Sequence, residues 1–189
     1  INVSLISQLH LLPPSTLRVH VFDVGQGDSI LLTSPSGKHI LVDGGPNLSL
    51  VQHLAKTLPF FDRTIDLLII THPNTDHLTA LPAILQHYHV RAALLPRASS
   101  PLPLYQEILG MLLQRDIPVL FPRPDIDINL GDGVIIDTLW PPESPKNEWL
   151  HNLNNIAVVI RAISGDQSIL LTGDIEEKAE MAILASGAD

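Results

Sequence analysis

The sequence predicts an α/β fold of the layered, α+β type, a sandwich in which mixed sheets and helices occupy separate layers. Three observations support this prediction. Strand patterns come first along the chain, helices and strands alternate in the middle, and two hairpins followed by a helix close it. A parallel doubly wound sheet would instead repeat strand and helix throughout. The chain has 189 residues, 45% of them hydrophobic, which is enough for one domain with a core.

The first part of the chain is predicted to hold an arm, three strands and a helix. Residues 1–16 end in Leu-Pro-Pro-Ser and are expected to be a linker or arm, with the domain at 17–189. Alternating apolar and polar residues after the arm predict a strand with one buried side. A Ser-Pro-Ser-Gly turn separates the next two strands, and Asn47 is placed to cap the helix. The predicted elements are strands at 17–23, 29–33 and 39–42 and a helix at 48–58.

The rest of the chain supplies the alternating elements and the hairpins. A continuous apolar run at 67–70 predicts a strand at 66–70 that is covered on both faces. Gly-Asp-Gly and Ser-Gly-Asp turns mark the two hairpins. The other predicted elements are helices at 78–89, 104–115 and 175–185 and strands at 92–95, 119–121, 126–130, 134–139, 156–163 and 168–171. The last helix runs into the end of the sequence, so we expect the domain to be incomplete at its C-terminus.

The composition excludes several classes of function. There is no cysteine, so disulfides and thiolate metal sites are excluded. No run approaches the roughly 18 apolar residues that a membrane span needs, and no signal peptide is recognisable. Twenty acidic against eleven basic residues give a formal charge of −9, which argues against a broad basic nucleic-acid face. A nuclease remains compatible with this charge, because bound divalent cations supply local positive charge.

The most informative segment is residues 71–77, which directly follow the buried strand at 66–70. It places His72, Asn74, Asp76 and His77 within six positions, and all four side chains can bind a cation. Loop residues at strand ends converge on crevices in α/β sheets, so the sequence predicts a metal centre there. Asp174 follows a second apolar strand in the same way. On residue types alone, the alternative is a solvated loop in which Asp76 and Asp174 cap helices.

Other polar groups are less informative. The two glycines between Asp23 and Asp28 predict a tight turn that either lines the site or only shapes a hairpin. Asp43-Gly44-Gly45 has the same two interpretations. Asn152, Asn154 and Asn155 precede a strand and are expected to form a turn, with lining of the site as the alternative. No ligand role is assigned to the scattered histidines His10, His20, His39, His53, His87, His89 and His151.

Five blocks together resemble a known family. In chain order they are Phe22-Asp23-Val24-Gly25-Gln26-Gly27-Asp28, Asp43-Gly44-Gly45, Thr71-His72-Pro73-Asn74-Thr75-Asp76-His77, Asn154-Asn155 and Leu171-Thr172-Gly173-Asp174. They resemble the metallo-β-lactamase superfamily and, within it, the C-terminal domain of ComEC-type DNA internalization competence proteins. The Asp-Val-Gly-Gln-Gly-Asp stretch carries the likeness to that branch. The resemblance implies an αββα sandwich with one or two divalent metal ions, manganese or zinc, and no small organic cofactor.

The resemblance also implies a function and a set of ligands. It implies a metal-dependent hydrolase, a nuclease that degrades the non-transported strand during natural transformation, with single-stranded DNA as substrate. Carried over by position, His72 and Asn74 hold the first metal, and Asp76, His77 and Asp174 serve the second. Asp76 also orients the attacking water as the catalytic residue. The parent protein would be anchored in the bacterial plasma membrane, with this chain as its soluble domain and the membrane channel portion as its partner.

Departures from the family pattern keep two other functions open. The family has His or Asp at the position of Asn74, and a neutral amide is a weaker ligand. The sequence stops before the family's histidine-rich strand end, and the usual histidine near Asn154 is absent. One alternative is a metallo-hydrolase that acts on a small ester, lactam or nucleotide. The other is a degenerate, non-catalytic binding domain.

Overall fold

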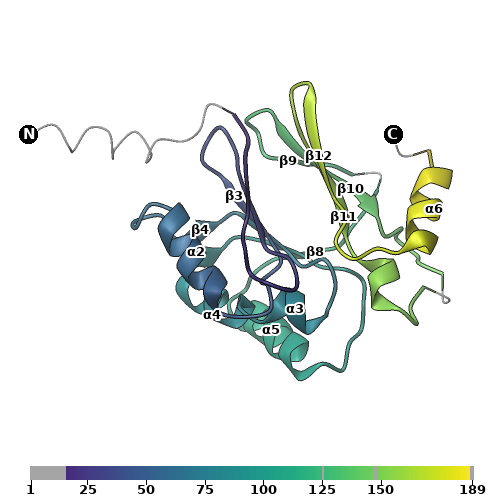
Figure 1. The fold of residues 1–189 in the computed structure, drawn as a ribbon, viewed down its shortest axis with the longest axis horizontal. Coiled ribbons are helices and arrows are strands. Elements are labelled where there is room, and N and C mark those ends of the chain that lie inside the picture. The colour runs from purple at the N-terminus through teal and green to yellow at the C-terminus, as the bar shows by residue number, and fades with distance from the viewer. Residues whose placement is uncertain (1–15, 125, 147–148, 188–189) are drawn as a thin grey trace, which may run out of the picture.

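The chain folds into two facing β-sheets with helices on their outer sides (Figure 1). The computed structural model describes residues 16–124, 126–146 and 149–187. The larger sheet has the order β1-β2-β3-β5-β7-β8, with β1 Arg18–Val21, β2 Ile30–Thr33, β3 His39–Val42, β5 Leu67–Ile69, β7 Ala93–Leu94 and β8 Val119–Leu120. The smaller sheet has the order β12-β11-β10-β9, with β12 Gln167–Leu171, β11 Val159–Ser164, β10 Val134–Trp140 and β9 Ile128–Asn129. A separate parallel pair joins β4 Thr64–Ile65 and β6 His89–Val90.

The helices lie outside the two sheets, which completes the predicted αββα sandwich. Those on the outer side of the larger sheet are α2 Ser49–Thr57, α4 Leu81–His87 and α5 Pro103–Gln114. Against the far side of the smaller sheet lies α6 Glu177–Ala185 (Figure 1). The short helix α3 Thr75–Leu78 follows β5. The 3-10 helix η1 Leu153–Ile156 precedes β11. Among the described residues, no helix is long and apolar enough to cross a membrane.

Strand direction in the larger sheet places the candidate site. β1, β2 and β3 pair antiparallel, whereas β3, β5, β7 and β8 run parallel. The sheet is therefore mixed, as the sequence predicts. Since parallel strands end at the same edge, the loops after β3 and β5 emerge side by side. One apolar cluster lies between this sheet and its helices, around Leu41 and Leu68, and a second lies between the sheets, around Ile40 and Ile69.

Local predictions fail at several positions. The strand β1 is exposed rather than half-buried: Val21 is 71% exposed, and β1 is the edge strand of the larger sheet. The helix predicted at 78–89 is interrupted at 79–80, and the last helix begins at Glu177 rather than at 175. The helix predicted to reach residue 89 ends at His87, because the backbone N–H of His89 donates to Arg63 and pairs β6 with β4. Ile156 belongs to η1 and not to the following strand.

Candidate metal centre

The loop that follows β5 carries two buried imidazoles. His72 comes three residues after the last residue of β5, and His77 lies in the short helix α3. Both side chains are buried, whereas Asp76, also in α3, is 46% exposed at its side chain. The predicted position of this loop, at the end of an internal strand, is therefore correct. Asp76 lies within the helix and not at its N-cap, so it does not act as the capping residue.

Three of the five predicted metal ligands lie together. One ligand atom each from His72, His77 and Asp174 falls within 4.8 Å of the others. The Asp174 Oδ2 is 3.8 Å from the Nε2 of His72 and 3.4 Å from the Nε2 of His77. Asp76 Oδ2 approaches the same His77 nitrogen to 3.9 Å. Since Asp174 comes from the loop after β12, the site joins both sheets of the sandwich.

The fifth predicted ligand, Asn74, has a different neighbourhood. Its side-chain amide donates to Asn154 Oδ1 over 3.2 Å. Asn154 in turn donates to Glu176 at 3.4 Å, and Asn152 donates to both Glu176 oxygens at 2.9 and 3.0 Å. These side chains form a polar row beside the cluster. The predicted turn at 152–155 is the helix η1, and its Asn152 caps the backbone N–H of Asn154.

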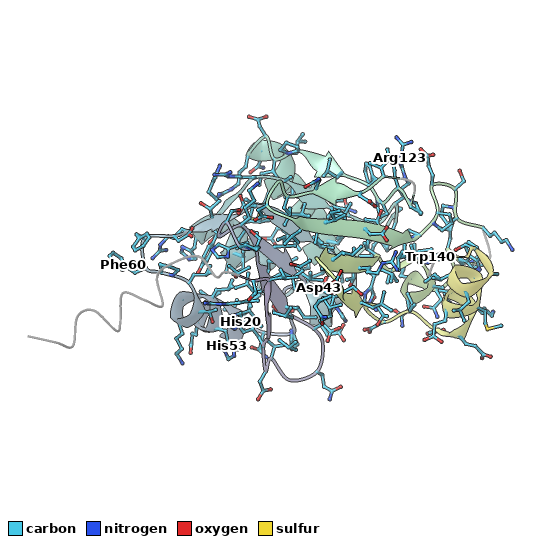
Figure 2. The ribbon with its side chains drawn as sticks, turned by 90° about the horizontal axis from the view of Figure 1, so that it is seen from above. His20, Asp43, His53, Phe60, Arg123 and Trp140 are labelled. Carbon is cyan, nitrogen blue, oxygen red and sulfur yellow. The ribbon has the colours of Figure 1, made fainter. Side chains whose placement is uncertain are left out.

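A carboxylate that the sequence analysis left undecided holds the loop in place. Asp43 is fully buried after β3 and accepts hydrogen bonds from the Thr71 backbone N–H (2.8 Å), the Thr71 hydroxyl (2.6 Å) and His77 Nδ1 (2.8 Å). Figure 2 labels Asp43 within the body of the protein. Its φ of 60° lies in the left-handed region, a conformation that costs a non-glycine residue about 1–3 kcal/mol. The aspartate in the Asp-Gly-Gly block was the signal that could have identified it.

Asp43 also decides which nitrogen of each imidazole carries a proton. The carboxylate is an acceptor, so the Nδ1 of His77 is the protonated nitrogen. The Thr71 hydroxyl has one proton and donates it to Asp43, so it can only accept from His72 Nδ1 at 3.0 Å. Both neutral imidazoles therefore keep their lone pair on Nε2. Both Nε2 atoms face Asp174.

The electrostatics of the two histidines differ. Burial lowers the pKa of His72, and the neighbouring His77 lowers it further, so His72 is neutral at pH 7. Burial also lowers the pKa of His77, but the Asp43 hydrogen bond and the surrounding carboxylates outweigh it and raise the pKa to about 9. In the absence of a cation, His77 therefore holds a proton at neutral pH. A cation and this proton compete for the same Nε2 atom.

Two glycines allow neighbouring loops to reach the site. A Cβ on Gly27, whose φ is +107°, would lie 2.1 Å from the backbone oxygen of Asp76. A Cβ on Gly173, at φ +52°, would lie 3.2 Å from the Thr71 side chain. The Gly-rich turn after β1 thus packs directly on the site loop. Burial raises the pKa of Asp28 in this turn, partly offset by the charge of His77, which places Asp28 in the electrostatic field of the site.

The donor set fits a divalent cation. The Nε2 atoms of His72 and His77 are buried and have no hydrogen-bond partner among the described residues. A buried polar atom without a partner is costly, so two of them converging on a carboxylate indicate a missing electrophile. Imidazole nitrogens with carboxylate oxygens suit zinc, manganese or iron. The ligand roles themselves stay predictions.

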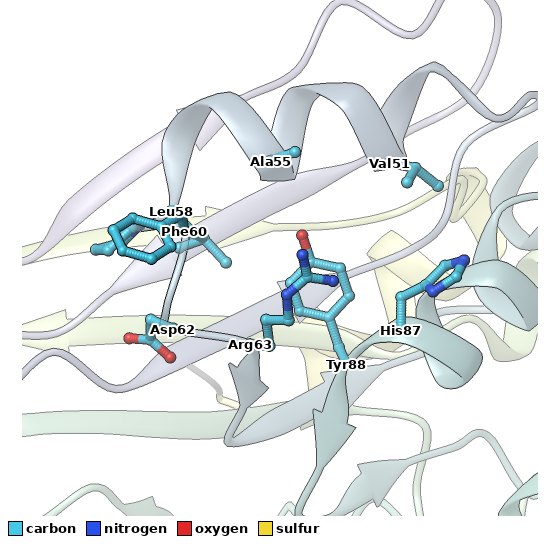
Figure 3. Close-up of a pocket in the computed structure, with 9 residues that line it drawn as sticks. Val51, Ala55, Leu58, Phe60, Asp62, Arg63, His87 and Tyr88 are labelled. Carbon is cyan, nitrogen blue, oxygen red and sulfur yellow. The ribbon is translucent and has the colours of Figure 1, made fainter.

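A hollow elsewhere on the protein does not belong to this site. It measures about 350 Å³ and lies between α2 and α4, where Figure 3 shows Tyr88 and Arg63 beneath the α2 helix. Its lining residues are Val51, Ala55, Leu58, Pro59, Phe60, Asp62, Arg63, His87 and Tyr88. None of the five predicted ligands is among them.

Comparisons with known proteins identify the family. The model of the family described as the metallo-beta-lactamase superfamily matches residues 22–187. ComE operon protein 3 of Bacillus subtilis (strain 168) is 26% identical over 187 residues, covering 88% of this chain and 23% of that protein. The chain thus spans about a quarter of the length of this relative.

Solved structures support the fold. The metallo-beta-lactamase fold protein YhfI from Bacillus subtilis matches with a TM-score of 0.54 and 15% identity, covering 86% of this chain and 65% of that one. CmlA, a diiron beta-hydroxylase from Streptomyces venezuelae, matches with a TM-score of 0.52 and 21% identity, covering 84% of this chain and 30% of that one. Sequence identities this low support a shared fold but do not establish a shared reaction.

Proposed function

The chain belongs to the metallo-beta-lactamase superfamily, and from that premise we propose that it is a metal-dependent hydrolase domain, specifically a nuclease. The proposed substrate is single-stranded DNA, namely the strand that is not transported during DNA uptake in natural transformation. The observation that carries the hydrolase proposal is the convergence of two buried, unpartnered Nε2 atoms on Asp174. The nuclease proposal rests on the Asp-Val-Gly-Gln-Gly-Asp block and on the relative from the ComE operon.

The proposed roles follow from burial and position. His72, His77 and Asp174 would hold the cation, which when bound lowers the pKa of water and stabilises developing negative charge. Asp43 accepts a hydrogen bond from His77 directly and contacts His72 through the Thr71 hydroxyl, so it fixes the orientation of both imidazoles. Asp76 is the most exposed of these carboxylates, with its Oδ2 3.9 Å from His77 Nε2. We assign it the positioning of the attacking water and the removal of its proton.

The cation and the cellular setting are also part of the proposal. We propose one or two divalent ions, manganese or zinc, as the donor set suits. A relative of which this chain spans 23% supports a larger parent protein. From the resemblance to ComEC-type proteins we propose that this parent is anchored in the plasma membrane and that its channel portion delivers the strand. Local delivery would compensate for the acidic charge of −9, which disfavours capture of free DNA.

The experiment that tests this function is cleavage of a labelled single-stranded oligonucleotide by the purified chain with manganese, with zinc and with a chelator. We expect cleavage that needs the cation and disappears in Asp76→Ala. Folded, metal-loaded protein that leaves the oligonucleotide intact but hydrolyses a small phosphate or carboxylic ester would favour the small-substrate hydrolase.

A non-catalytic binding domain is the remaining candidate. The observation that favours it is Asn74, a neutral side chain at a predicted ligand position, whose amide nitrogen donates to Asn154. Protein that binds a cation but cleaves neither DNA nor small esters would support this candidate over both hydrolases.

A further inference from the structure

Three aromatic rings stack in a row on the surface of the protein, outside the metal site. The rings of His20 and Phe22 are 6.4 Å apart between centroids and inclined by 21°. Phe22 and His53 are 5.4 Å apart and inclined by 23°. Figure 2 shows His20 and His53 close together on one side of the protein. We call these three residues the aromatic row. The Phe60–Phe61 pair elsewhere on the protein is edge-to-face instead, at 83°.

The row lies at the outer rim of the larger sheet. His20 is paired opposite Leu31, which belongs to the core between this sheet and its helices, so His20 points toward the helix side. Phe22, two residues later, points the same way and packs against that core. His53 comes from α2. Since β1 is the edge strand, the His20 end of the row is open to solvent.

The row is linked to the metal site through the Gly-rich turn between β1 and β2. The backbone N–H of Phe22 donates to Ser29 and so closes the base of the Gly-rich turn between β1 and β2. The same turn presses Gly27 against the backbone of Asp76. His53 also contacts the turn, because its Nε2 lies 3.1 Å from the Asp23 backbone oxygen. A strand lying along the row would therefore reach the candidate catalytic loop across one short turn.

The charges around the row favour a polyanion. Arg18 is exposed and shares the face of β1 that carries His20, two residues away. Lys56 follows His53 by three positions on α2, and such residues are neighbours on one helix face. The exposed Asp23 is the acidic group of this segment. In a chain of charge −9, two cations flanking a row of rings are a local exception.

We propose that the aromatic row is a base-stacking platform that binds single-stranded nucleic acid and leads it to the metal site. A base can stack on the outer face of His20 or of His53, the two end rings of the row, while Arg18 and Lys56 attract the phosphates. A duplex does not fit this chemistry, because its bases already stack on each other. The inference rests on the proposed nuclease function and assigns the surface by which that function selects its substrate.

Binding is measured by fluorescence anisotropy, with a labelled oligothymidylate and a chelator present so that no cleavage occurs. We expect His20→Ala and His53→Ala each to weaken binding about tenfold, and duplex DNA of the same length to bind more weakly than the single strand. Phe22 lies between the two histidines, so Phe22→Leu keeps the apolar packing but removes the ring that holds them in line, and it should also weaken binding. The matched control is His87→Ala, an exposed histidine on α4 away from the row, which should leave affinity unchanged.

An abasic strand separates stacking from simple charge attraction. It keeps every phosphate but has no base to stack, so the row variants should bind it as the parent protein does. By contrast, Arg18→Gln should weaken the binding of both strands. The slope of log affinity against log salt concentration should decrease by the amount expected for about one phosphate contact. Row variants that bind oligothymidylate with unchanged affinity, or a parent protein that prefers duplex or does not bind the single strand, would overturn the platform.

Hydrolysis of a small diester, bis(p-nitrophenyl) phosphate, distinguishes failure of the platform from failure of the proposed function. The diester is too small to span the row, so its cation-dependent hydrolysis should be equal in all row variants. If the row variants hydrolyse the diester and bind the strand as tightly as the parent protein, the platform is ruled out and the hydrolase is supported. If the row variants bind the strand more weakly but the parent protein hydrolyses neither substrate, the platform is supported and the nuclease is ruled out.

Discussion

Asp43 and His77 lie 34 residues apart in sequence and are joined in the protein interior by a 2.8 Å hydrogen bond from Nδ1 to Oδ2. The same carboxylate oxygen accepts the Thr71 hydroxyl, which in turn accepts from His72. One buried carboxylate therefore sets the tautomer of both histidines that face Asp174. Such hydrogen bonds behind a ligand commonly decide how well a site holds its cation.

Replacing this carboxylate by its amide should weaken the cation site. We expect Asp43→Asn to lower the affinity for manganese or zinc by about 10- to 100-fold, because the imidazoles lose their fixed orientation and their negative neighbour. Isothermal titration calorimetry measures the change. Asp137→Asn is the matched control, since it removes a largely buried carboxylate that pairs with Arg161 away from the site. Equal loss of affinity in both variants would show that the effect is only one of stability.

The raised pKa of His77 predicts a definite pH dependence. Its value of about 9 in the folded protein exceeds the ordinary 6.5, so protonated His77 stabilises the cation-free fold. This contribution is fully present below pH of about 6.5 and is lost as the pH rises through about 9. Thermal unfolding with chelator should therefore show a Tm that falls across this interval. A Tm that is flat or rising between these pH values would contradict the assignment.

Cation affinity should show the opposite trend over the same interval. The proton on His77 must leave before Nε2 can bind a cation, so affinity should increase with pH until about 9. Calorimetry in buffers of different ionisation enthalpy at pH 7 should detect a proton released on binding. In Asp43→Asn, the released fraction should be smaller, because the pKa of His77 loses its main support.

Asp76 should be needed for turnover. We expect Asp76→Ala to reduce cation-dependent cleavage by about 10²- to 10⁴-fold, the range typical of a positioned acid–base group. The exposed carboxylate of Asp166, in the turn between β11 and β12, serves as the control. If Asp76→Ala cleaves at the parent rate with unchanged metal content, its catalytic role is wrong.

A charge at position 74 should strengthen the site. Asn74→Asp supplies a carboxylate where the chain has a neutral amide, and we expect cation affinity to increase by about tenfold. Asn154→Ala breaks the 3.2 Å bond to Asn74 without adding charge, so it separates the two effects. A titration in which Asn74→Asp binds no more tightly than the parent would remove position 74 from the ligand set.

The contact between the Gly-rich turn and the site loop can be tested by a matched pair of glycines. Both Gly25 and Gly27 have positive φ, but only at Gly27 would a Cβ meet the Asp76 backbone, at 2.1 Å. Gly25→Ala should lower the free energy of unfolding by about 1 kcal/mol through its backbone conformation alone. Gly27→Ala should cost more than Gly25→Ala in urea denaturation and also lower cleavage. Equal free energies of unfolding for the two variants would show that the turn can shift away from the Asp76 backbone to accommodate the added Cβ.

Most of the fold could be predicted because its signals are local. The apolar run before His72, the Gly-Asp-Gly hairpin and the stripe of α5 each fit one element, and each is present. The errors lie where a distant partner decides the outcome. His89 leaves its predicted helix because β4 offers it a strand partner, and β1 is exposed as the edge strand of the larger sheet.

Local patterns in the sequence were enough to predict the element order, the mixed two-sheet sandwich and a polar loop at the end of a buried strand. They also pointed to His72, Asn74, Asp76 and His77 in that loop and to Asp174 after a second strand as candidate ligands. The tertiary structure was needed to show that Asp174 lies within 4.8 Å of His72 and His77, that Asp43 sets the protonation of the two imidazoles and that His20 stacks with Phe22 and His53. These relationships depend on which strands and helices become neighbours. That choice is made by burial of the apolar faces summed over the whole chain, and no local pattern records it.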